Sequence, residues 1–446
     1  MPPMPDPGSI PPPHPSFREA LAVWVRIGLL SFGGPTGQIA LMHRELVERR
    51  RWISDRRFLH ALNYCMLLPG PEAHQLAIYT GWLLHGTRGG LAAGILFVLP
   101  GALLLWGISL LYVGAGNHPL FSALFYGLKP AVIALVAVAV LRIAGRTLRG
   151  PFLWSVAASA FVAIALFHLP FPLILLTAGF AGWIGGKIAP GAFPAGGAHG
   201  SASPETDAGA YVIDDRSIPG TIRPMQTVRT AVGWSILWLA PVFLCLAMLG
   251  GDHLFTQLGA FFTKAALLTV GGAYAVLPYV AQQAVETHGW LSPAQMMDGL
   301  GLAETTPGPL ILVLQFVGFL AGWNAPGAWN PWAAATLAAA LTTWVTFLPG
   351  FLFIFVGAPY IERGRGNLDL HTALSAITAA VVGVVLNLGV WFAWNVVRPA
   401  SGGTDLFAAV AALIFFFLLH RKKLDVLPLI ALAAITGWVW KLLTGL

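Results

Sequence analysis

Short clusters of proline and glycine interrupt the long apolar stretches of this chain. Pro-Gly-Pro occupies residues 69–71 inside an apolar run from 58 to 84, and it returns at residues 307–309. Proline lacks a backbone donor and disfavours helix at the residue before it, so an unbroken helix through Pro-Gly-Pro is not expected. In hydrocarbon, such a break is tolerated only where the freed backbone groups are buried in protein or line a watery cavity. The sequence therefore predicts discontinuous or re-entrant helices.

The composition is that of a membrane protein with many spans. Of the 446 residues, 57% are hydrophobic and only 10% are charged, and the mean hydropathy is +0.74. An ordinary soluble domain has about 25% charged residues. The net charge of +7 does not indicate nucleic-acid binding, because the basic residues lie in short loops and form no stripe with interleaved aromatic residues. Orientation in a lipid bilayer explains them better.

Few residues suggest an enzyme, a metal site or a cofactor. Cys65 and Cys245 are the only cysteines, so we expect buried apolar roles for them and no disulfide framework. His60 and His74 lack the HxxxH or HExxH spacing of a zinc site. Residues 299–304 only partly resemble a dinucleotide loop and follow no predicted strand. The sequence therefore predicts no catalytic residues, no metal and no cofactor.

The apolar runs divide the chain into five parts. Residues 1–16 are rich in Pro and lack the pattern of a cleaved signal peptide, so we expect a disordered cytoplasmic tail. Residues 17–188 form a first repeat, and residues 250–446 form a second one. Between them we expect a solvated cytoplasmic linker at 189–227, rich in Gly, Pro and Ser, and an extra linking span at 228–249.

Within the first repeat, two interrupted elements precede four cleaner spans. The first interrupted element covers residues 17–42 and is broken near residues 33–37, whereas the second is broken at residues 69–71. A basic segment at 43–57 separates them. The cleaner runs are expected to cross about 30 Å of hydrocarbon. They occupy residues 89–113, 121–141, 152–167 and 171–188.

The second repeat has the same order of features as the first. A shift of 238 positions superposes glycines, prolines and tryptophans, and an insertion of 11 residues near 324–332 then changes the offset. The matched pairs include Phe17 and Phe255, Gly33 and Gly271, Trp52 and Trp290, Gly70 and Gly308, and, beyond the insertion, Pro100 and Pro349. Chance would not hold this register over such a length, so the sequence predicts an internal duplication.

Loop charges indicate that the two repeats have opposite orientations. Cytoplasmic loops have the excess of Lys and Arg. In the first repeat the basic residues follow the first interrupted element and the fourth element. In the second repeat they lie at 363–365 and 421–423, in non-equivalent loops, with Arg398 as an exception. The predicted fold class is therefore an all-α polytopic membrane protein with two inverted-topology repeats and discontinuous or re-entrant helices.

The four breaks are the predicted substrate site. In inverted repeats, discontinuous helices meet near the bilayer midplane, and their N-terminal amides favour an anion. The alternative is that the glycines only allow tight helix packing. The predicted residues of the breaks are Gly33, Gly34, Pro35, Pro69, Gly70, Pro71, Gly271, Gly272, Pro307, Gly308 and Pro309.

Two matched cations lie inside apolar runs ahead of the Gly-Gly breaks. Arg26 and Lys264 occupy equivalent positions, and a charge at that depth is costly unless it has a function. We expect them to supply positive field for a bound anion. Snorkelling to the lipid headgroups is the alternative. Lys129, just before Pro130, has no basic counterpart in the second repeat, and its role stays open.

Three carboxylates near the Pro-Gly-Pro breaks are candidates for proton or ion coupling. Glu72 follows the first Pro-Gly-Pro and either caps the next half-helix or exchanges a proton. Glu304 and Asp298 precede the second Pro-Gly-Pro, a position that fits a cap poorly and favours coupling. Glu48 and Glu286 lie near tryptophans and are expected to mark the membrane interface.

These residues resemble the signatures of the CHR family of chromate transporters, in its long, two-domain type. The motifs are Phe-Gly-Gly-Pro at 32–35, the basic run at 42–52, Leu-Pro-Gly-Pro-Glu at 68–72 with Gln75, and residues 301–310. The resemblance covers nearly the whole chain from Phe17, apart from the linker and the extra span, and it adds Gln75 to the predicted substrate-binding residues. Thr-Gly-Gln at 36–38 departs from the Ala-Ala-His of many relatives, which removes a titrating group.

The resemblance implies a multi-pass protein of the bacterial cytoplasmic membrane that exports chromate and confers chromate resistance. An antiporter is the transport class that it implies. Chromate is a tetrahedral dianion suited to several amides and one or two cations, without a metal. Sulfate has nearly the same shape and charge, so a carrier of sulfate or another oxyanion is an alternative. A membrane sensor or scaffold is a second alternative, but it should have a folded soluble output domain. A homodimer stays open.

Overall fold

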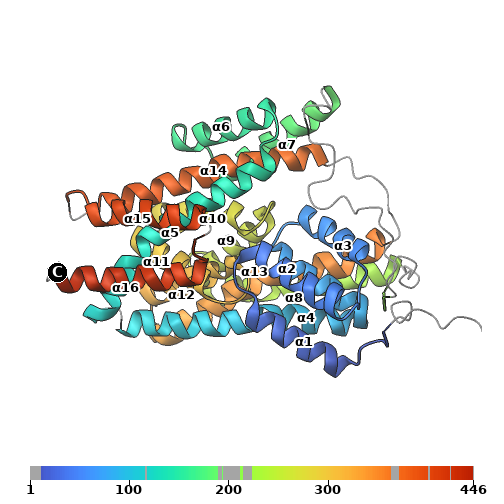
Figure 1. Ribbon diagram of the computed structural model, residues 1–446. Helices are drawn as coiled ribbons and strands as arrows, with labels where there is room; N and C mark the ends of the chain where they lie inside the picture. The colour runs from blue at the N-terminus through green and yellow to red at the C-terminus, as the bar shows by residue number, and fades with distance from the viewer. Residues whose placement is uncertain are drawn as a thin grey trace, which may run out of the picture.

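The computed structural model describes residues 12–115, 118–188, 193, 211–213, 224–362, 371–399, 402–421 and 423–444. Within these residues the regular elements are helices, numbered α1 to α16 (Figure 1). Seven of these helices are long and apolar enough to cross a membrane. The predicted class, an all-α polytopic membrane protein, is therefore confirmed.

Both predicted interruptions are present in the first half of the chain. One break separates α1 from α2, and Pro-Gly-Pro separates α3 from α4. The long helix α4 also bends at His85 and Gly86, whose backbone is not helical. The helices of this half are α1 (Phe17–Leu30), α2 (Gly34–His43), α3 (Asp55–Leu67), α4 (Glu72–Ala115), α5 (Pro119–Thr147), α6 (Pro151–Ala165) and α7 (Phe171–Ile188).

The second half contains the corresponding breaks, between α9 and α10 and after α11. A π-helical turn follows α10 (Gln283–Thr287), as one follows α2 (Arg44–Arg49). Ser54 and Ser292, which are 238 positions apart, cap α3 and α11 through their hydroxyls. The helices are α8 (Pro224–Leu249), α9 (Leu254–Leu268), α10 (Ala273–Gln282), α11 (Pro293–Thr305), α12 (Val313–Asn324), α13 (Pro331–Ile361), α14 (His371–Val397), α15 (Leu406–His420) and α16 (Val426–Thr444).

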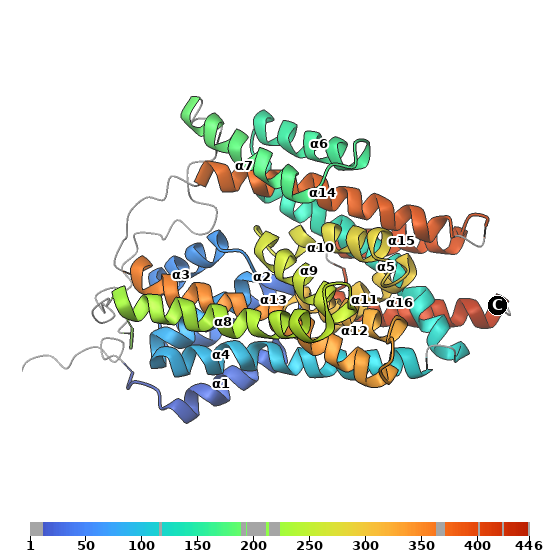
Figure 2. The same cartoon turned by 180° about the vertical axis from the view of Figure 1, so that it is seen from behind.

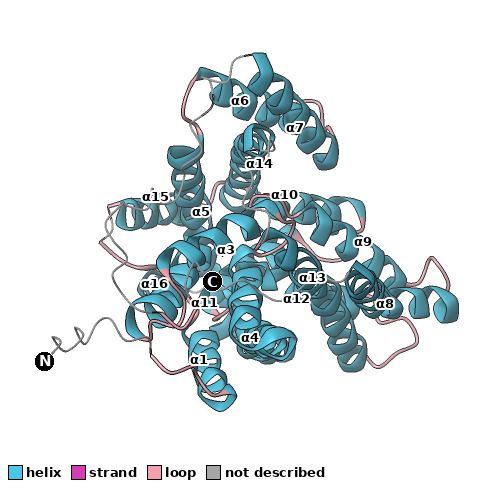
Figure 3. Cartoon of the chain, turned by 90° about the vertical axis from the view of Figure 1, so that its right-hand side faces the viewer, coloured by secondary structure: helices cyan, strands magenta, loops and turns pink. Residues whose placement is uncertain are grey.

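The helices form two bundles that lie side by side. In the first, α4 packs on α13, and α1, α8, α9 and α12 surround this pair. In the second, α5 packs on α14, and α6, α7, α15 and α16 surround it. Figures 1 and 2 show α6, α7 and α14 above α1, α4 and α8, and Figure 3 shows the same arrangement end-on. Because α10 packs on α14 and α11 packs on α5, these two helices connect the bundles.

Small residues allow the helices of the second bundle to approach closely. A Cβ added to Gly127 of α5 would lie 2.0 Å from the carbonyl oxygen of Ala433 in α16, and one added to Gly383 of α14 would lie 2.0 Å from that of Ala157 in α6. Apolar side chains gain nothing by leaving lipid for other apolar side chains, so close backbone packing is what favours association.

Residues of the predicted linker and tail contact the helices of the first repeat. In the linker, Tyr211–Ile213 does not lie in solvent: the amide of Ile213 donates to Trp52 at 3.0 Å, and Ser54 donates back at 3.1 Å. Helix α8 begins four residues before the predicted extra span. Pro15 of the tail is buried, and residues 1–11 lie outside the described residues. Most of the linker and residues 363–370 and 422 also lie outside them.

Candidate substrate site

Each break contains glycine with a left-handed backbone. An L side chain is strained in that region of φ, so these positions require glycine for conformational reasons. The φ angles are 85° at Gly33, 71° at Gly34, 123° at Gly70, 85° at Gly271, 97° at Gly272 and 97° at Gly308.

Two backbone hydrogen bonds connect the breaks of one half to those of the other. The amide of Gly70 donates to the carbonyl of Thr269 at 2.7 Å, and the amide of Gly308 donates to the carbonyl of Ser31 at 2.8 Å. Ser31 and Thr269 are 238 positions apart, as are Gly70 and Gly308. The structure thus brings the four breaks together as two crossed pairs, each with one break from either half.

Two buried glutamines donate hydrogen bonds to carbonyl groups at the breaks. Gln38 Nε2 donates to the carbonyls of Gly308 at 2.6 Å and Ser31 at 3.2 Å, and Gln75 Nε2 donates to Pro69 at 2.7 Å. The Oε1 atoms of both glutamines are buried and have no hydrogen-bond partner among the described residues. A buried acceptor without a donor is costly, so these oxygens suit a donor supplied by water or a ligand.

The amides at the first Pro-Gly-Pro break fall into two groups, those used in the crossed pairs and those of the helix that follows. The amides of Gly70 and Gly308 are used in the crossed pairs. Those of Glu72, Ala73 and His74, in the first turn of α4, have no acceptor in the described part of the chain. The first turn of a helix is its positive end, so α4 still directs unpaired donors at the break.

The two Gly-Gly breaks differ in their surroundings. A Cβ added to Gly33 or Gly34 would meet no atom within 4 Å. A Cβ on Gly271 would lie 3.6 Å from Thr378 Oγ1, and one on Gly272 would lie 3.5 Å from Glu72 Oε1. The start of α2 therefore faces open space, whereas the start of α10 is covered by α14 and by the first residue of α4.

Two of the predicted coupling carboxylates lie against residues in the first turn of α10 or just before it. Glu72 lies beside Gly272 and has no hydrogen bond or ion pair among the described residues. Glu304 accepts a hydrogen bond from the hydroxyl of Tyr274, and Arg142 is close enough for its charge to act on Glu304. The positive end of α10 thus faces two carboxylates, an arrangement suited to holding negative charge or exchanging a proton.

The predicted cations lie on exposed helix faces. Arg26 is half exposed, and its Nε lies 3.9 Å from Glu45 Oε1. Lys264 is exposed, and its ammonium lies 5.8 Å from the centre of the Tyr279 ring. No hydrogen bond or ion pair connects either side chain to a break in the part of the chain that is described. The structure therefore does not bring these two cations into contact with the crossed pairs.

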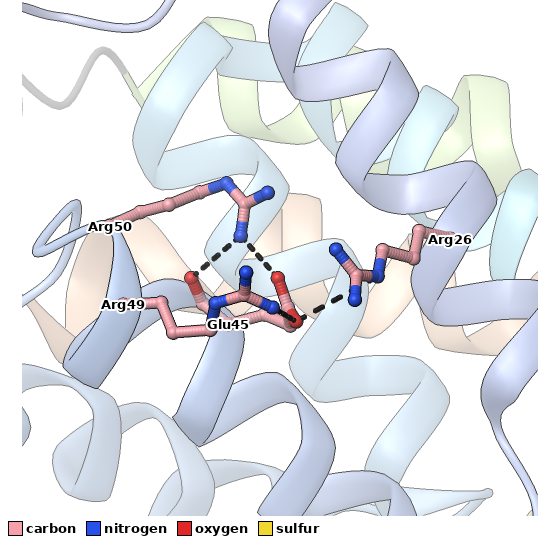
Figure 4. A network of polar contacts seen from close by, with 4 residues as sticks. All are labelled: Arg26, Glu45, Arg49 and Arg50. Carbon is pink, nitrogen blue, oxygen red and sulfur yellow. Dashed lines mark hydrogen bonds and ion pairs between the residues drawn. The ribbon is translucent and has the colours of Figure 1, made fainter.

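Three guanidinium groups surround the buried carboxylate of Glu45 (Figure 4). Arg26 reaches it from α1, and Arg49 and Arg50 reach it from the turn after α2. Burial opposes ionisation of Glu45, but the hydrogen bond and charge of Arg50, the charge of Arg26 and the hydrogen bond of Arg49 hold its pKa below its usual value. This cluster connects α1 to the turn after α2. Its three guanidinium groups and one carboxylate give that turn a net positive charge.

Sequence reasoning missed a buried ion pair between the two halves. Arg57 Nη2 lies 2.6 Å from Glu362 Oε2, and the hydroxyl of Tyr79 donates to Glu362 Oε1 at 2.6 Å. Both charged side chains are almost fully buried. Arg57 belongs to a basic segment that the sequence places in solvent. The one available signal was the acidic residue directly after the apolar run of α13.

Comparison with known proteins gives a consistent set of relatives. The sequence profile of a family described as chromate transporter matches residues 18–183 and 256–438. The chromate transport protein of Pseudomonas aeruginosa is 33% identical over 441 residues, which cover 97% of this chain and 94% of that protein.

Two further relatives are also named for chromate transport. The chromate transport protein of Cupriavidus metallidurans is 28% identical over 427 residues, covering 95% of this chain and 93% of its own. The probable chromate transport protein of Synechococcus elongatus is 28% identical over 377 residues, which cover 83% of this chain and 84% of that protein. No solved structure matches the chain.

Proposed function

The chain belongs to the chromate transporter family, and we propose that it exports chromate from the bacterial cytoplasm and so confers chromate resistance. Its helices make it a multi-pass membrane protein, and the proposal places it in the cytoplasmic membrane. The relatives named as chromate transport proteins support this substrate. The proposed activity is binding and release of an unchanged anion, without a catalytic step.

The crossed pairs of breaks are the observation on which the proposal depends. They hold positive helix ends inside a protein whose helices are long enough to span a bilayer. Chromate is a tetrahedral dianion, and unpaired amides at helix N-termini bind such anions without a metal. The open start of α2 at Gly33, Gly34 and Pro35 is the proposed binding position. The other breaks are proposed to hold it in place through the hydrogen bonds of the crossed pairs.

The two halves are proposed to be inverted repeats. Equivalent residues exchange the hydrogen bonds of the crossed pairs, and the two ranges matched by the family profile begin 238 positions apart. In Figure 1, α2 and α3 lie toward one end of the molecule, and α11, α16 and the C-terminus lie toward the other. The arginine-rich segment between α2 and α3 favours the cytoplasm for the first of these ends.

Coupling is proposed to involve Glu72 beside Gly272, Glu304 bonded to Tyr274 of α10, and Asp298 on α11. Arg26 and Lys264 would then act on the anion through their field rather than by contact, because their side chains are exposed.

Everted membrane vesicles test the proposal. Vesicles containing the protein are expected to accumulate labelled chromate when energised, and unlabelled sulfate in excess should compete if the site accepts both dianions. Vesicles that accumulate sulfate but not chromate would show that sulfate, and not chromate, is the substrate. Equal chromate uptake by vesicles with and without the protein would refute export.

A further inference from the structure

The three guanidinium groups around Glu45 have donors that the protein leaves unused (Figure 4). The Glu45 side chain is 1% exposed, and its carboxylate accepts from Arg49 Nη1 at 2.9 Å and from Arg50 Nη1, with Arg26 Nε 3.9 Å away. A guanidinium group has five N–H donors. The remaining nitrogens of the three groups have no hydrogen bond or ion pair in the described part of the chain. One buried carboxylate is therefore shared by three cations that can each bind a further anion.

Contacts within the turn after α2 hold these cations in place. Glu45 and Arg49 lie four residues apart in the π-helical turn, and the guanidinium of Arg50 lies 5.5 Å from the centre of the Trp52 ring. Trp52 is buried, and its amide donates to the carbonyl of Leu46 at 2.8 Å. Cations that are fixed in advance lose little freedom on binding, and planar guanidinium groups match the geometry of phosphate oxygens. The turn is therefore suited to binding a phosphate group.

The other carboxylates of this segment are already paired. Residues 43–57 contain six arginines and three carboxylates. Apart from Glu45, the carboxylates are those of Glu48 and Asp55, which lie 3.0 Å and 2.6 Å from the two ring nitrogens of His43. The excess positive charge around Glu45 thus has no free counter-charge in the segment and favours an anion from outside it.

Helix α1 places this charge at the border of an apolar surface. Its exposed face begins with Arg18 and Glu19, and Arg26 is the last charged residue on it. Leu29 and Leu30 follow and are 52% and 50% exposed. In a bilayer, cations toward the end of a membrane helix lie at headgroup level, and exposed leucines lie among the acyl chains. Arg26 therefore lies where the lipid headgroups meet the acyl chains.

The apolar surface continues from α1 onto α4. The two helices touch at this level, because a Cβ added to Gly28 would lie 2.0 Å from the carbonyl oxygen of Leu96. Close to Leu96 in α4, Ile95 and Leu99 are 49% and 43% exposed. A free phosphate makes no use of such a surface, whereas a phospholipid covers it with its acyl chains. The surroundings of the cluster therefore favour a lipid over a soluble anion.

The second repeat forms the same turn without these charges. The positions 238 residues after the carboxylate and the two arginines of the turn are Gln283, Thr287 and His288. Residues 283–287 are nevertheless a π-helical turn, like that of the first repeat. The turn therefore does not need the three cations in order to fold, and a ligand explains their presence.

We propose that Arg26, Arg49 and Arg50 form a binding site for an anionic phospholipid of the cytoplasmic leaflet. The phosphate oxygens accept hydrogen bonds from the unused guanidinium nitrogens, and the acyl chains lie along Leu29 and Leu30 of α1. The arginine-rich segment sets the leaflet, because cytoplasmic loops have the excess of Lys and Arg. The site is separate from the breaks and does not depend on which anion the protein transports.

Native mass spectrometry of the purified full-length protein tests the site. The protein, in a neutral detergent, is titrated with phosphatidylglycerol or with phosphatidylcholine of the same acyl chains, whose own ammonium neutralises its phosphate. The wild-type protein should bind phosphatidylglycerol more tightly by roughly tenfold or more, the gain from a charge-assisted hydrogen bond. Equal affinity for the two lipids would overturn the inference.

Two variants assign the binding to the cluster. Arg49→Gln should weaken the binding of phosphatidylglycerol by roughly tenfold and leave that of phosphatidylcholine unchanged. Arg44→Gln is the matched control, because Arg44 is an exposed arginine of the same segment and makes no ion pair with the Glu45 carboxylate. It should bind both lipids like the wild-type protein. An equal loss in both variants, which indicates diffuse attraction, or no loss in Arg49→Gln would overturn the inference.

Photo-crosslinking locates the lipid without any variant, so the inference stays testable if Arg49→Gln fails to fold. In wild-type protein in nanodiscs, a phosphatidylglycerol with a photoreactive headgroup should label peptides within residues 17–52. Labelling confined to other segments would overturn the inference. Loss of the labelling in excess inorganic phosphate would show that the cluster takes a free phosphate, and it would overturn the lipid as the ligand.

Discussion

At the scale of single residues, position 70 requires glycine for two reasons, and both apply to Gly70→Ala. Its φ of 123° strains any L side chain, and an added Cβ would lie 2.7 Å from Gln75 Nε2. We expect Gly70→Ala to lower the free energy of unfolding by roughly 1–3 kcal/mol. The cost of the backbone strain and the cost of displacing the Gln75 side chain both contribute.

Thermal unfolding in detergent measures this effect. Gly107→Ala is the matched control, since Gly107 lies inside α4 and an added Cβ there meets no atom within 4 Å. The control should be neutral or slightly stabilising. Equal stability of the two variants would contradict the strain at position 70.

Glu72 gives a second prediction at this scale. It has no hydrogen bond or ion pair among the described residues, so Glu72→Gln should cost little stability while removing a titratable group. Chromate accumulation in everted vesicles should then lose its response to an imposed pH gradient and keep its response to membrane potential.

Glu48→Gln is the control for Glu72→Gln, because Glu48 is exposed and, among the described residues, its one polar partner is His43. It should behave like the wild-type protein in both assays. A pH response that survives in Glu72→Gln would remove this carboxylate from coupling.

Single residues also show the limit of prediction from sequence. The breaks were predictable because Pro-Gly-Pro cannot continue a helix. The use of the Gly70 and Gly308 amides was not, because their acceptors, Thr269 and Ser31, are distant in the chain. The place of Arg26 within an apolar run was visible in the sequence, but its exposed face was not predictable, since one helix alone does not reveal its neighbours.

At the scale of helices, the buried pair of Arg57 and Glu362 connects α3 to the end of α13. Removing one charge leaves the other buried without compensation, which typically costs about 3–5 kcal/mol. Arg57→Met should therefore destabilise the protein strongly in thermal unfolding.

The double variant Arg57→Met with Glu362→Leu separates charge from packing. It should recover a large part of the lost stability, because no charge is then buried alone. If the double variant is as unstable as the two single losses added together, the pair is not coupled as the structure indicates.

The breaks at the Gly-Gly and Pro-Gly-Pro clusters followed from glycine and proline placement, but several helix lengths and the helix pairing did not. The sequence marked residues 189–227 as solvated by composition, yet Tyr211–Ile213 pairs with the backbone around Trp52. Three apolar residues in a polar linker are too weak a signal to predict such a contact. The asymmetry between α2 and α10 was also unpredictable, because equivalent sequences occupy different surroundings.

At the scale of the whole molecule, the proposed inversion would place equivalent loops on opposite sides of the membrane. Glu48 and Glu286 are exposed, equivalent residues in the turns after α2 and α10. In a chain whose native cysteines are replaced by alanine, Glu48→Cys should react with an impermeant thiol reagent only from the cytoplasmic side.

Glu286→Cys should react only from the opposite side. Intact and everted vesicles provide the two orientations, and each variant serves as the control for the other. Labelling of both cysteines from one side would show that the repeats are parallel.

The central claim is that helix ends at the crossed breaks bind a tetrahedral oxyanion inside the membrane. An experimental density map of the protein in lipid nanodiscs with bound chromate tests this claim most directly. We predict density for the anion at the start of α2, within hydrogen-bonding distance of unpaired amides. Chromate bound away from all four breaks, or breaks that face lipid, would contradict the account.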